Sequence, residues 1–141
     1  IEMFYSDRVE TKWPLRHQLP IVSNVPVHCT ASGKLYLSSL PKNQCATLVS
    51  VLPLEKFTDN TLVQPDDLLK AIDLIRKDQV GLDDEEFVDG MVAVAVPIND
   101  NKGRMVAALA FHAPAVRMDI SKARTYLPIL RKAALALSVT E

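Results

Sequence analysis

The sequence predicts one α+β domain built on an antiparallel sheet, and three observations support this prediction. Residues 91–98 and 105–112 are two apolar runs joined by NDNKGR, whose Asn, Asp and Gly are typical of a hairpin turn. Helical patterns precede and follow this hairpin, and no segment of the sequence repeats. The chain has 141 residues, of which 48% are hydrophobic and 23% charged, so it is long enough to bury one core.

Composition and charge exclude several classes of protein. The formal net charge is -1, with acidic and basic residues mixed along the sequence, so we do not expect this chain itself to bind nucleic acid. No apolar run approaches the ~20 residues of a membrane span, and no signal peptide is recognisable. The cysteines, Cys29 and Cys45, lack CxxC spacing and are expected to be reduced thiols. We therefore expect a cytoplasmic protein that uses no disulfide, metal or cofactor.

The first half of the sequence alternates extended and helical patterns. Residues 1–10 favour a strand and start without methionine, so we expect a fragment that begins within a strand or hairpin. Residues 20–29 are punctuated by proline and should be extended. Helices are predicted over about residues 30–40 and 42–52, separated by a proline, and a loop over 55–64.

Two further helices are predicted from stronger signals. Residues 64–78 form the clearest helix, because Pro65 lies in its first turn, two aspartates follow, and basic residues close it. The chain is helical again from about residue 121, although Pro128 must kink or restart that helix. The apolar stripe of the first of these helices comprises Leu68, Leu69, Ile72 and Ile75, and that of the second Leu127, Leu130, Ala134 and Leu137.

The predicted hairpin has two unequal faces. Pairing residue 98 with residue 105 gives the cross-strand pairs Ala95–Ala108, Ala93–Ala110 and Met91–His112. The face with these alanines is small. The opposite face carries bulky residues for a core, namely Val92, Val94, Val96, Ile98, Leu109 and Phe111. The small face indicates either the close approach of a helix or a ligand cavity, and His112 at its end slightly favours the cavity.

The stretch VPVHCTASGKLYLSSLP, residues 25–41, allows three interpretations. A phosphate-binding loop is the weakest, because the early glycine is missing and Leu35 stands where Ser or Thr should follow Gly-Lys. A catalytic Cys29 needs a histidine beside it, and adjacent residues of a strand point in opposite directions, so His28 is badly placed. The third interpretation is a helix capped by Thr30 or Ser32, either with an anionic ligand at its free N–H groups or with no ligand.

Several motifs together resemble one family. VPVHCTASGK before an apolar helix is similar to the Pro-Leu-His-Cys-Thr-Ala-x-Gly-Lys segment of the effector-binding domain in IclR-type bacterial transcriptional regulators. EMFYSDRVET resembles that family's strand ending in Asp-Arg-Val-Glu. FTDNTL, DDEEFVDGMVAVAVPIND and LPILRKAALALS follow its pattern in the right order, so the resemblance runs from about Met3 to Ser138. It implies a GAF-like fold: a curved antiparallel sheet flanked by helices, with a pocket between the sheet and the loops.

The chain departs from this family at several positions. Gln79-Val80 replaces the usual Gly-aromatic pair, and Asn99 replaces an aromatic residue. The pocket positions that are often Cys or Ser match Ala93, Ala110 and His112, which implies an effector other than the small keto acids that some members sense. Carried over residue by residue, the effector-binding site comprises Ala31, Ser32, Asp83, Ala93, Ala110 and His112.

The resemblance also implies roles for these residues. Ser32 and the nearby N–H groups would hold an anionic or carbonyl group, and a protonated His112 would bind a carboxylate. Asp83 would accept a hydrogen bond from a hydroxyl or ammonium group. Two alanines make the site roomier and more apolar, so we expect a carboxylate with a hydrocarbon or aromatic body.

The function that the resemblance implies is sensing. A small organic-acid effector would change the DNA affinity of an attached winged helix-turn-helix domain, which lies outside this chain. Residues 1–141 would be one effector-binding domain that forms a homodimer or a dimer of dimers, meets no membrane, and reaches DNA only through that other domain. The alternative is a free-standing GAF-like enzyme that uses Cys29 or Cys45.

Overall fold

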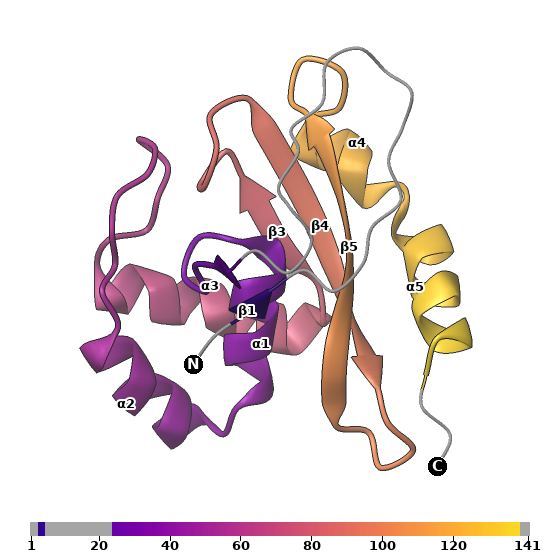
Figure 1. Ribbon diagram of the computed structural model, residues 1–141, viewed down its shortest axis with the longest axis horizontal. Coiled ribbons are helices and arrows are strands. Elements are labelled where there is room, and N and C mark those ends of the chain that lie inside the picture. Colours follow the sequence, from indigo (N-terminus) through magenta and orange to yellow (C-terminus); the bar gives the residue numbers. More distant parts are fainter. Residues whose placement is uncertain (1–2, 5–23, 139–141) are drawn as a thin grey trace.

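The computed structural model describes residues 3–4 and 24–138 (Figure 1). Most of the strand predicted over residues 1–10, including the Asp-Arg-Val-Glu motif, lies outside the described residues. The elements in chain order are β1 (Met3–Phe4), β2 (Asn24–Val25), α1 (Ala31–Ser39), α2 (Lys42–Val51), α3 (Pro65–Asp78), β3 (Gly81–Asp84), β4 (Met91–Asn99), β5 (Met105–Pro114), α4 (Ile120–Arg124) and α5 (Leu127–Ala136).

The main sheet has three antiparallel strands in the order β3-β4-β5, and helices lie on both of its faces (Figure 1). α1 and the C-terminal part of α3 pack against one face, whereas α4 and α5 pack against the other. β1 and β2 pair with each other as a separate antiparallel ribbon. The predicted α+β class with an antiparallel sheet is therefore confirmed.

Local sequence signals explain where the first helices begin and end. Thr30 caps α1, because its Oγ1 accepts a hydrogen bond from the N–H of Gly33 at 3.1 Å. Pro65 starts α3, where a first-turn residue needs no N–H partner. α3 ends before Gln79, whose φ of 58° is left-handed. Of the predicted stripe of α3, Leu68, Ile72 and Ile75 are buried and Leu69 is half-buried.

Pro128 restarts the C-terminal helix instead of kinking it. α4 ends at Arg124, and Pro128 then lies in the first turn of α5. Leu127 and Ala134 are buried against the sheet, as predicted. The prediction for Leu137 is wrong: this side chain is exposed, because α5 ends at Ala136 and the chain leaves the sheet there.

The register of the hairpin differs from the predicted one by two residues. The structure pairs Met91 with Pro114, and also Ala93 with His112, Ala95 with Ala110 and Pro97 with Ala108. One residue of this shift arises because Asn99, and not Ile98, pairs with Met105. The other arises from a β-bulge beside Ile98 and Asn99, which leaves one residue of β5 unpaired after Met105. A shift of two residues leaves every side chain on its predicted face, so both faces of the hairpin are as expected.

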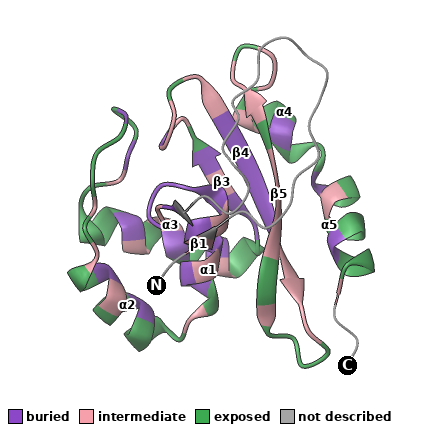
Figure 2. Ribbon diagram, in the orientation of Figure 1, coloured by how far each residue is buried: buried purple, intermediate pink, exposed green. Residues whose placement is uncertain are grey.

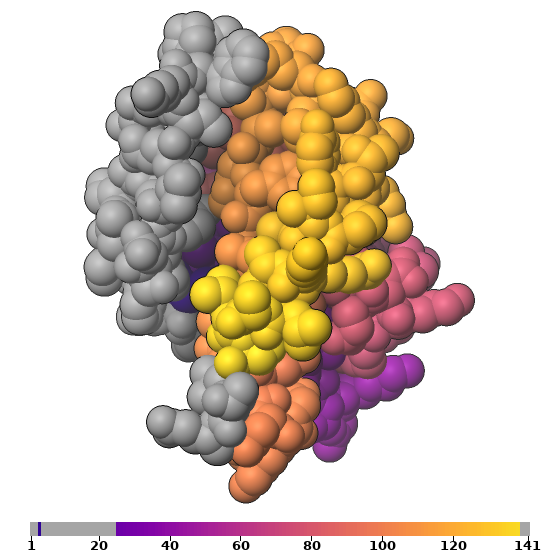
Figure 3. Space-filling view, turned by 90° about the vertical axis from the view of Figure 1, so that its right-hand side faces the viewer, coloured from indigo at the N-terminus to yellow at the C-terminus, as the bar shows by residue number. Residues whose placement is uncertain are grey.

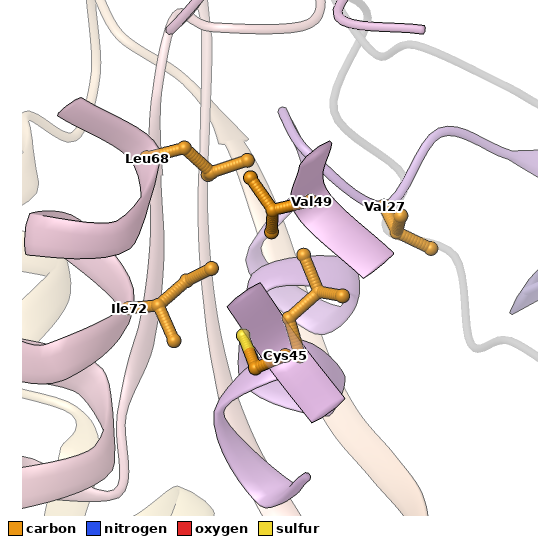
Figure 4. Packing of buried hydrophobic residues seen from close by; sticks show 6 residues of the cluster. Val27, Cys45, Val49, Leu68 and Ile72 are labelled. Atoms are coloured by element: carbon orange, nitrogen blue, oxygen red, sulfur yellow. The ribbon is translucent and has the colours of Figure 1, made fainter. Parts of the chain in front are cut away.

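Buried apolar side chains form three clusters, two of them on the two faces of the sheet. β4 contributes to both faces and is buried along most of its length (Figure 2). The third cluster joins α1, α2 and α3 and contains Val27, Leu37, Cys45, Val49, Leu68 and Ile72 (Figure 4). None of the described helices has the length and apolar character that would let it cross a membrane.

Candidate functional site

Two cross-strand rows on one face of the sheet bring most of the predicted residues together. In the first row, Ala93 of β4 lies between Asp83 of β3 and His112 of β5. The neighbouring row contains Gly81, Ala95 and Ala110. Directly paired residues of antiparallel strands project their side chains to the same side of the sheet. Four of the six predicted residues therefore share one face.

The start of α1 lies against these two rows. A Cβ atom on Gly81 would be 2.1 Å from the carbonyl oxygen of Ala31, so only glycine permits this approach. Ala31 and Leu35 of α1 pack in one buried cluster with Ala93 and Ala95. The small side chains of Ala93 and Ala95 thus permit the close approach of α1, which is one of the two interpretations of the small face.

The predicted residues differ in exposure. Ala31, Asp83 and Ala93 are buried, Ser32 and Ala110 are half-buried, and His112 is exposed. Thr30 and not Ser32 caps α1, and the Ser32 hydroxyl makes no hydrogen bond within the described residues. The accessible part of this group of residues is therefore the margin of the small face, at Ser32, Ala110 and His112.

Two hollows of the surface lie away from these rows. One, of about 270 Å³, is lined by Lys56, Phe57, Thr58, Asp59 and Asp89. The other, of about 220 Å³, lies between α5 and the end of β4, and its lining includes Pro97, Arg131 and Leu135. Neither hollow is lined by a predicted site residue, so the six residues stay a prediction as a ligand site.

A buried ion pair connects α1 to the turn that follows β3. Nζ of Lys34 lies 2.7 and 2.8 Å from the two carboxylate oxygens of Glu86, and both side chains are buried. The second oxygen of Glu86 also accepts the N–H of Asp84 at 3.1 Å. Sequence reasoning missed this pair. The spacing of Ala31, Lys34 and Ser38 places Lys34 on the buried side of α1, but nothing local indicates an acid 52 residues away.

Asp83 is buried beside this ion pair. Its Oδ1 accepts the N–H of Glu86 at 2.8 Å. Burial, together with the negative charge of Glu86, raises the pKa of Asp83 to about 7, although backbone N–H groups and Lys34 act in the opposite direction. The acidic run 83–86 does not simply face water, because only Asp84 in it is fully exposed.

The loop that contains FTDNTL holds the same turn from the other side. Thr58 and Thr61 donate hydrogen bonds from their hydroxyls to the carbonyls of Glu85 and Glu86, both at 2.6 Å. Asn60 Nδ2 donates to the carbonyl of Asp84 at 2.9 Å. Glu85 has a left-handed φ of 56°, which costs free energy in a residue other than glycine. These side-chain hydrogen bonds therefore hold a strained turn in place next to Asp83.

Neither cysteine suits nucleophilic chemistry. Cys29 is fully buried, and burial together with the charges of Asp83 and Glu86 raises the pKa of its thiol to about 12. Burial also raises the pKa of Cys45, which lies in the cluster between α2 and α3 (Figure 4). Nε2 of His28 lies 2.8 Å from the carbonyl oxygen of Glu55, so this ring nitrogen contacts the backbone and not the thiol of Cys29. The geometry thus contradicts the alternative of a cysteine enzyme.

Comparison with known proteins identifies similar chains. The family model described as "Bacterial transcriptional regulator IclR C-terminal" matches residues 1–139. The curated protein "Probable transcriptional regulator SauR" of Cupriavidus necator is 42% identical over 133 residues, which cover 94% of this chain and 53% of that protein. This chain therefore spans about half the length of the curated relative.

Solved structures share the fold. The IclR protein of Thermotoga maritima matches with a TM-score of 0.86 at 29% identity, over 94% of this chain and 54% of the other. The inducer-binding domain of PobR from Acinetobacter, solved as a double mutant with 3-hydroxybenzoic acid, matches with a TM-score of 0.79 at 28% identity, over 84% of this chain and 68% of the other. These similar proteins are named as transcriptional regulators and not as enzymes.

Proposed function

Since this chain belongs to the IclR family of bacterial transcriptional regulators and is its C-terminal effector-binding domain, we propose that it binds a small organic acid at the margin of the small face. The observation that carries the proposal is the row Asp83–Ala93–His112, which lies next to the start of α1. This arrangement combines backbone donors, a carboxyl group and an imidazole around small side chains. It offers polar groups to a ligand without the bulk that would exclude one.

The start of α1 supplies the proposed anion contact. Thr30 Oγ1 satisfies the N–H of Gly33, whereas the N–H groups of Ala31 and Ser32 have no partner within the described residues. The positive end of the helix dipole favours a negative group there. The Ser32 hydroxyl can donate a further hydrogen bond. A carboxylate is the ligand group that suits these donors.

The rest of the proposed site favours an acid with a hydrocarbon or aromatic body. Ala110 would present only a methyl group to it, with Ala93 beneath the start of α1 next to it, and His112 would add a charge-assisted hydrogen bond to a carboxylate when protonated. Asp83 would meet a hydroxyl or ammonium group of the ligand. The PobR domain, which is similar in fold, was solved with 3-hydroxybenzoic acid, a hydroxylated aromatic acid of this kind.

We further propose that binding acts by a shift between conformations. An effector that binds one arrangement of this domain more tightly than another changes the population of the two, and no chemistry on the ligand is needed. In the whole protein the change would reach a helix-turn-helix domain that binds DNA. The chain covers 53% of the SauR relative, which leaves room for such a domain in that relative.

Self-association is also proposed, as a homodimer or a dimer of dimers. α5 lies on the molecular surface (Figure 3), where the apolar side chains of Ile129 and Leu135 are exposed, as is Leu137 just after the helix. A second copy of the chain would remove these groups from water. Sedimentation should show a dimer or larger species at tens of micromolar. A clean monomer at this concentration would contradict self-association. An assembly that Leu135→Glu leaves unchanged would contradict the use of this surface.

The effector proposal is tested by thermal unfolding of the purified chain with a panel of acids that includes pyruvate, hexanoate and 3-hydroxybenzoate. A ligand at one hundred times its dissociation constant adds about 2.7 kcal/mol of stability, which raises the unfolding midpoint of a domain of this size by several degrees. We expect one class of acids to produce this shift. Both Ser32→Ala and His112→Ala should then reduce it.

The matched control is Ser39→Ala, which removes an exposed serine hydroxyl from the same helix. It should leave the shift unchanged. If no acid of the panel changes the unfolding midpoint, the carboxylate class is wrong. If an acid stabilises all three variants as it does the wild type, the ligand binds elsewhere and the site assignment is wrong.

A further inference from the structure

Three charged side chains are buried together beside the proposed site. Lys34, Asp83 and Glu86 are exposed by only 3%, 5% and 8%. Charged groups are almost never this buried unless each has a partner, because leaving water costs several kcal/mol per ion. Two of these groups are carboxyls and one is an ammonium. If all three were ionised, the cluster would carry one unmatched negative charge.

The hydrogen bonds show which carboxyl lacks a cation. Both oxygens of Glu86 contact Lys34, at 2.7 and 2.8 Å, so that pair is complete. Asp83 instead accepts a backbone N–H, that of Glu86 at 2.8 Å. Among the described residues no basic side chain forms an ion pair with Asp83. Asp83 is therefore the member of the cluster for which ionisation is most costly.

Among the described residues, the groups that act on the Asp83 carboxyl leave the charges unbalanced. The thiol of Cys29, whose pKa is about 12, stays neutral. On β4 the cross-strand neighbour of Asp83 is Ala93, which has no charge. Beyond it in the same row is His112 on β5. The other described groups that act on Asp83 are Glu86 and Lys34, whose charges cancel, and the backbone N–H groups of residues 86 and 87.

We propose that this cluster binds one proton, on Asp83, near neutral pH, and that the proton sets the charge that a ligand meets at the proposed site. A pKa of about 7 for Asp83, raised mainly by its burial, agrees with this count of charges. The protonation itself does not depend on any ligand. Its effect on an effector rests on the function proposed above.

The two forms of Asp83 would favour different ligand groups. A protonated carboxyl is neutral and does not repel a ligand carboxylate held at the start of α1. The ionised form only accepts hydrogen bonds and repels a carboxylate. Acids should therefore bind more weakly as the pH rises through the pKa of Asp83. Binding of such an acid would in turn hold the proton on the protein.

The proton is tested first in the chain without a ligand. The NMR signal of the Asp83 carboxyl carbon, assigned by its loss in Asp83→Asn, is followed from about pH 5 to pH 9. We expect a midpoint near 7, far above the ordinary value of about 4 for aspartate. A midpoint at the ordinary value would overturn the proposal.

Thermal unfolding gives an independent measurement. A carboxyl whose pKa is raised by folding stabilises the protein fully below its unfolded pKa, and this stability is lost as the pH rises to the folded value. The unfolding midpoint of the wild type should therefore fall between about pH 4 and pH 7 relative to Asp83→Asn, which keeps the acceptor for the Glu86 N–H. Asp84→Asn, a change at the exposed neighbour, should follow the wild type. Parallel curves for wild type and Asp83→Asn would contradict the proposal.

The ligand part is tested with 3-hydroxybenzoate and pyruvate, titrated at pH 6 and pH 8. For the wild type we expect an affinity loss of up to about tenfold per pH unit above the pKa of Asp83. The loss should be smaller in Asp83→Asn, and His112→Ala separates any contribution of the imidazole. An equal loss in Asp83→Asn would refute the link to the ligand. If neither acid binds, the proposed effector class fails, while the NMR midpoint still decides the protonation.

Discussion

The two faces of β4 differ in what they allow their neighbours to do. On one face Val92, Val94 and Val96 are buried, the last two under α4 and α5, and their bulk fills the space between sheet and helices. On the other face Ala93 and Ala95 meet the start of α1. Alternation along one strand thus separates a packing face from a face that brings backbone N–H groups and buried charges close to the sheet. The proposed site needs the face with the alanines, and the face with the valines stabilises the sheet that carries this site.

The largest effect is expected from breaking the buried ion pair between α1 and the turn that follows β3. Lys34→Met keeps much of the side-chain volume but leaves Glu86 buried without its cation. Removal of one partner of a buried pair costs about 3–5 kcal/mol. We expect the free energy of unfolding, measured with urea, to fall by about this amount.

A double variant shows whether charge or packing causes that loss. Lys34→Met combined with Glu86→Gln removes both charges, and the Gln oxygen can still accept the N–H of Asp84. Replacement of a whole buried pair by neutral groups is often nearly neutral for stability. The double variant should therefore recover most of the loss. If it is as unstable as Lys34→Met, the methylene stem of Lys34 and not its charge stabilises the fold.

The second effect tests the packing face against the small face directly. Val94→Ala removes two buried methyl groups and should cost about 2–3 kcal/mol. Ala95→Val adds two methyl groups where α1 approaches the sheet, and overpacking of this kind costs about 1–3 kcal/mol. Val51→Ala, at an exposed position of α2, is the control and should change stability by less than about 0.5 kcal/mol. Urea denaturation measures all three.

Binding separates the two variants further. Ala95→Val should displace α1 and so weaken the thermal shift produced by any acid that stabilises the wild type. Val94→Ala should leave that shift unchanged. The opposite outcome would mean that the small face of β4 has no part in the site.

The sequence predicted the parts of the fold that depend on local signals. The bounds of α3 follow from Pro65 at its start and basic residues at its end, and both faces of the hairpin follow from simple alternation. The register of the hairpin could not be predicted in the same way, because nothing in the sequence marks the bulge beside Ile98. β3 was not predicted either, since four residues that include two aspartates look like a polar loop.

The candidate site was predictable only in part, and for a physical reason. Asp83, Ala93 and His112 were identified by resemblance to a family, and the sheet places them in one row. The ion pair of Lys34 and Glu86 was missed, because a contact across 52 residues depends on how α1 packs on β3 and not on any local pattern. The burial of Asp83 follows from the same packing.

The smallest effect is expected at the loop that holds the turn beside the small face. Thr61→Val removes the hydroxyl that donates to the carbonyl of Glu86 and accepts the N–H groups of Phe57 and Thr58. Loss of a buried partner costs about 1–3 kcal/mol, and part of it is recovered if water enters. We expect a loss near 1 kcal/mol in urea denaturation. Hydrogen exchange at residues 84–87 should become faster.

The control for this variant is Thr47→Val, which removes an exposed threonine hydroxyl from α2. It should change neither the stability by more than about 0.5 kcal/mol nor the exchange of residues 84–87. Asp83 lies in β3 just before this turn, so faster exchange of the turn should accompany a pKa of Asp83 closer to the ordinary value, because water then reaches the carboxyl. If Thr61→Val speeds exchange and leaves the midpoint of the Asp83 signal unchanged, burial under α1 and not the loop keeps that proton in place.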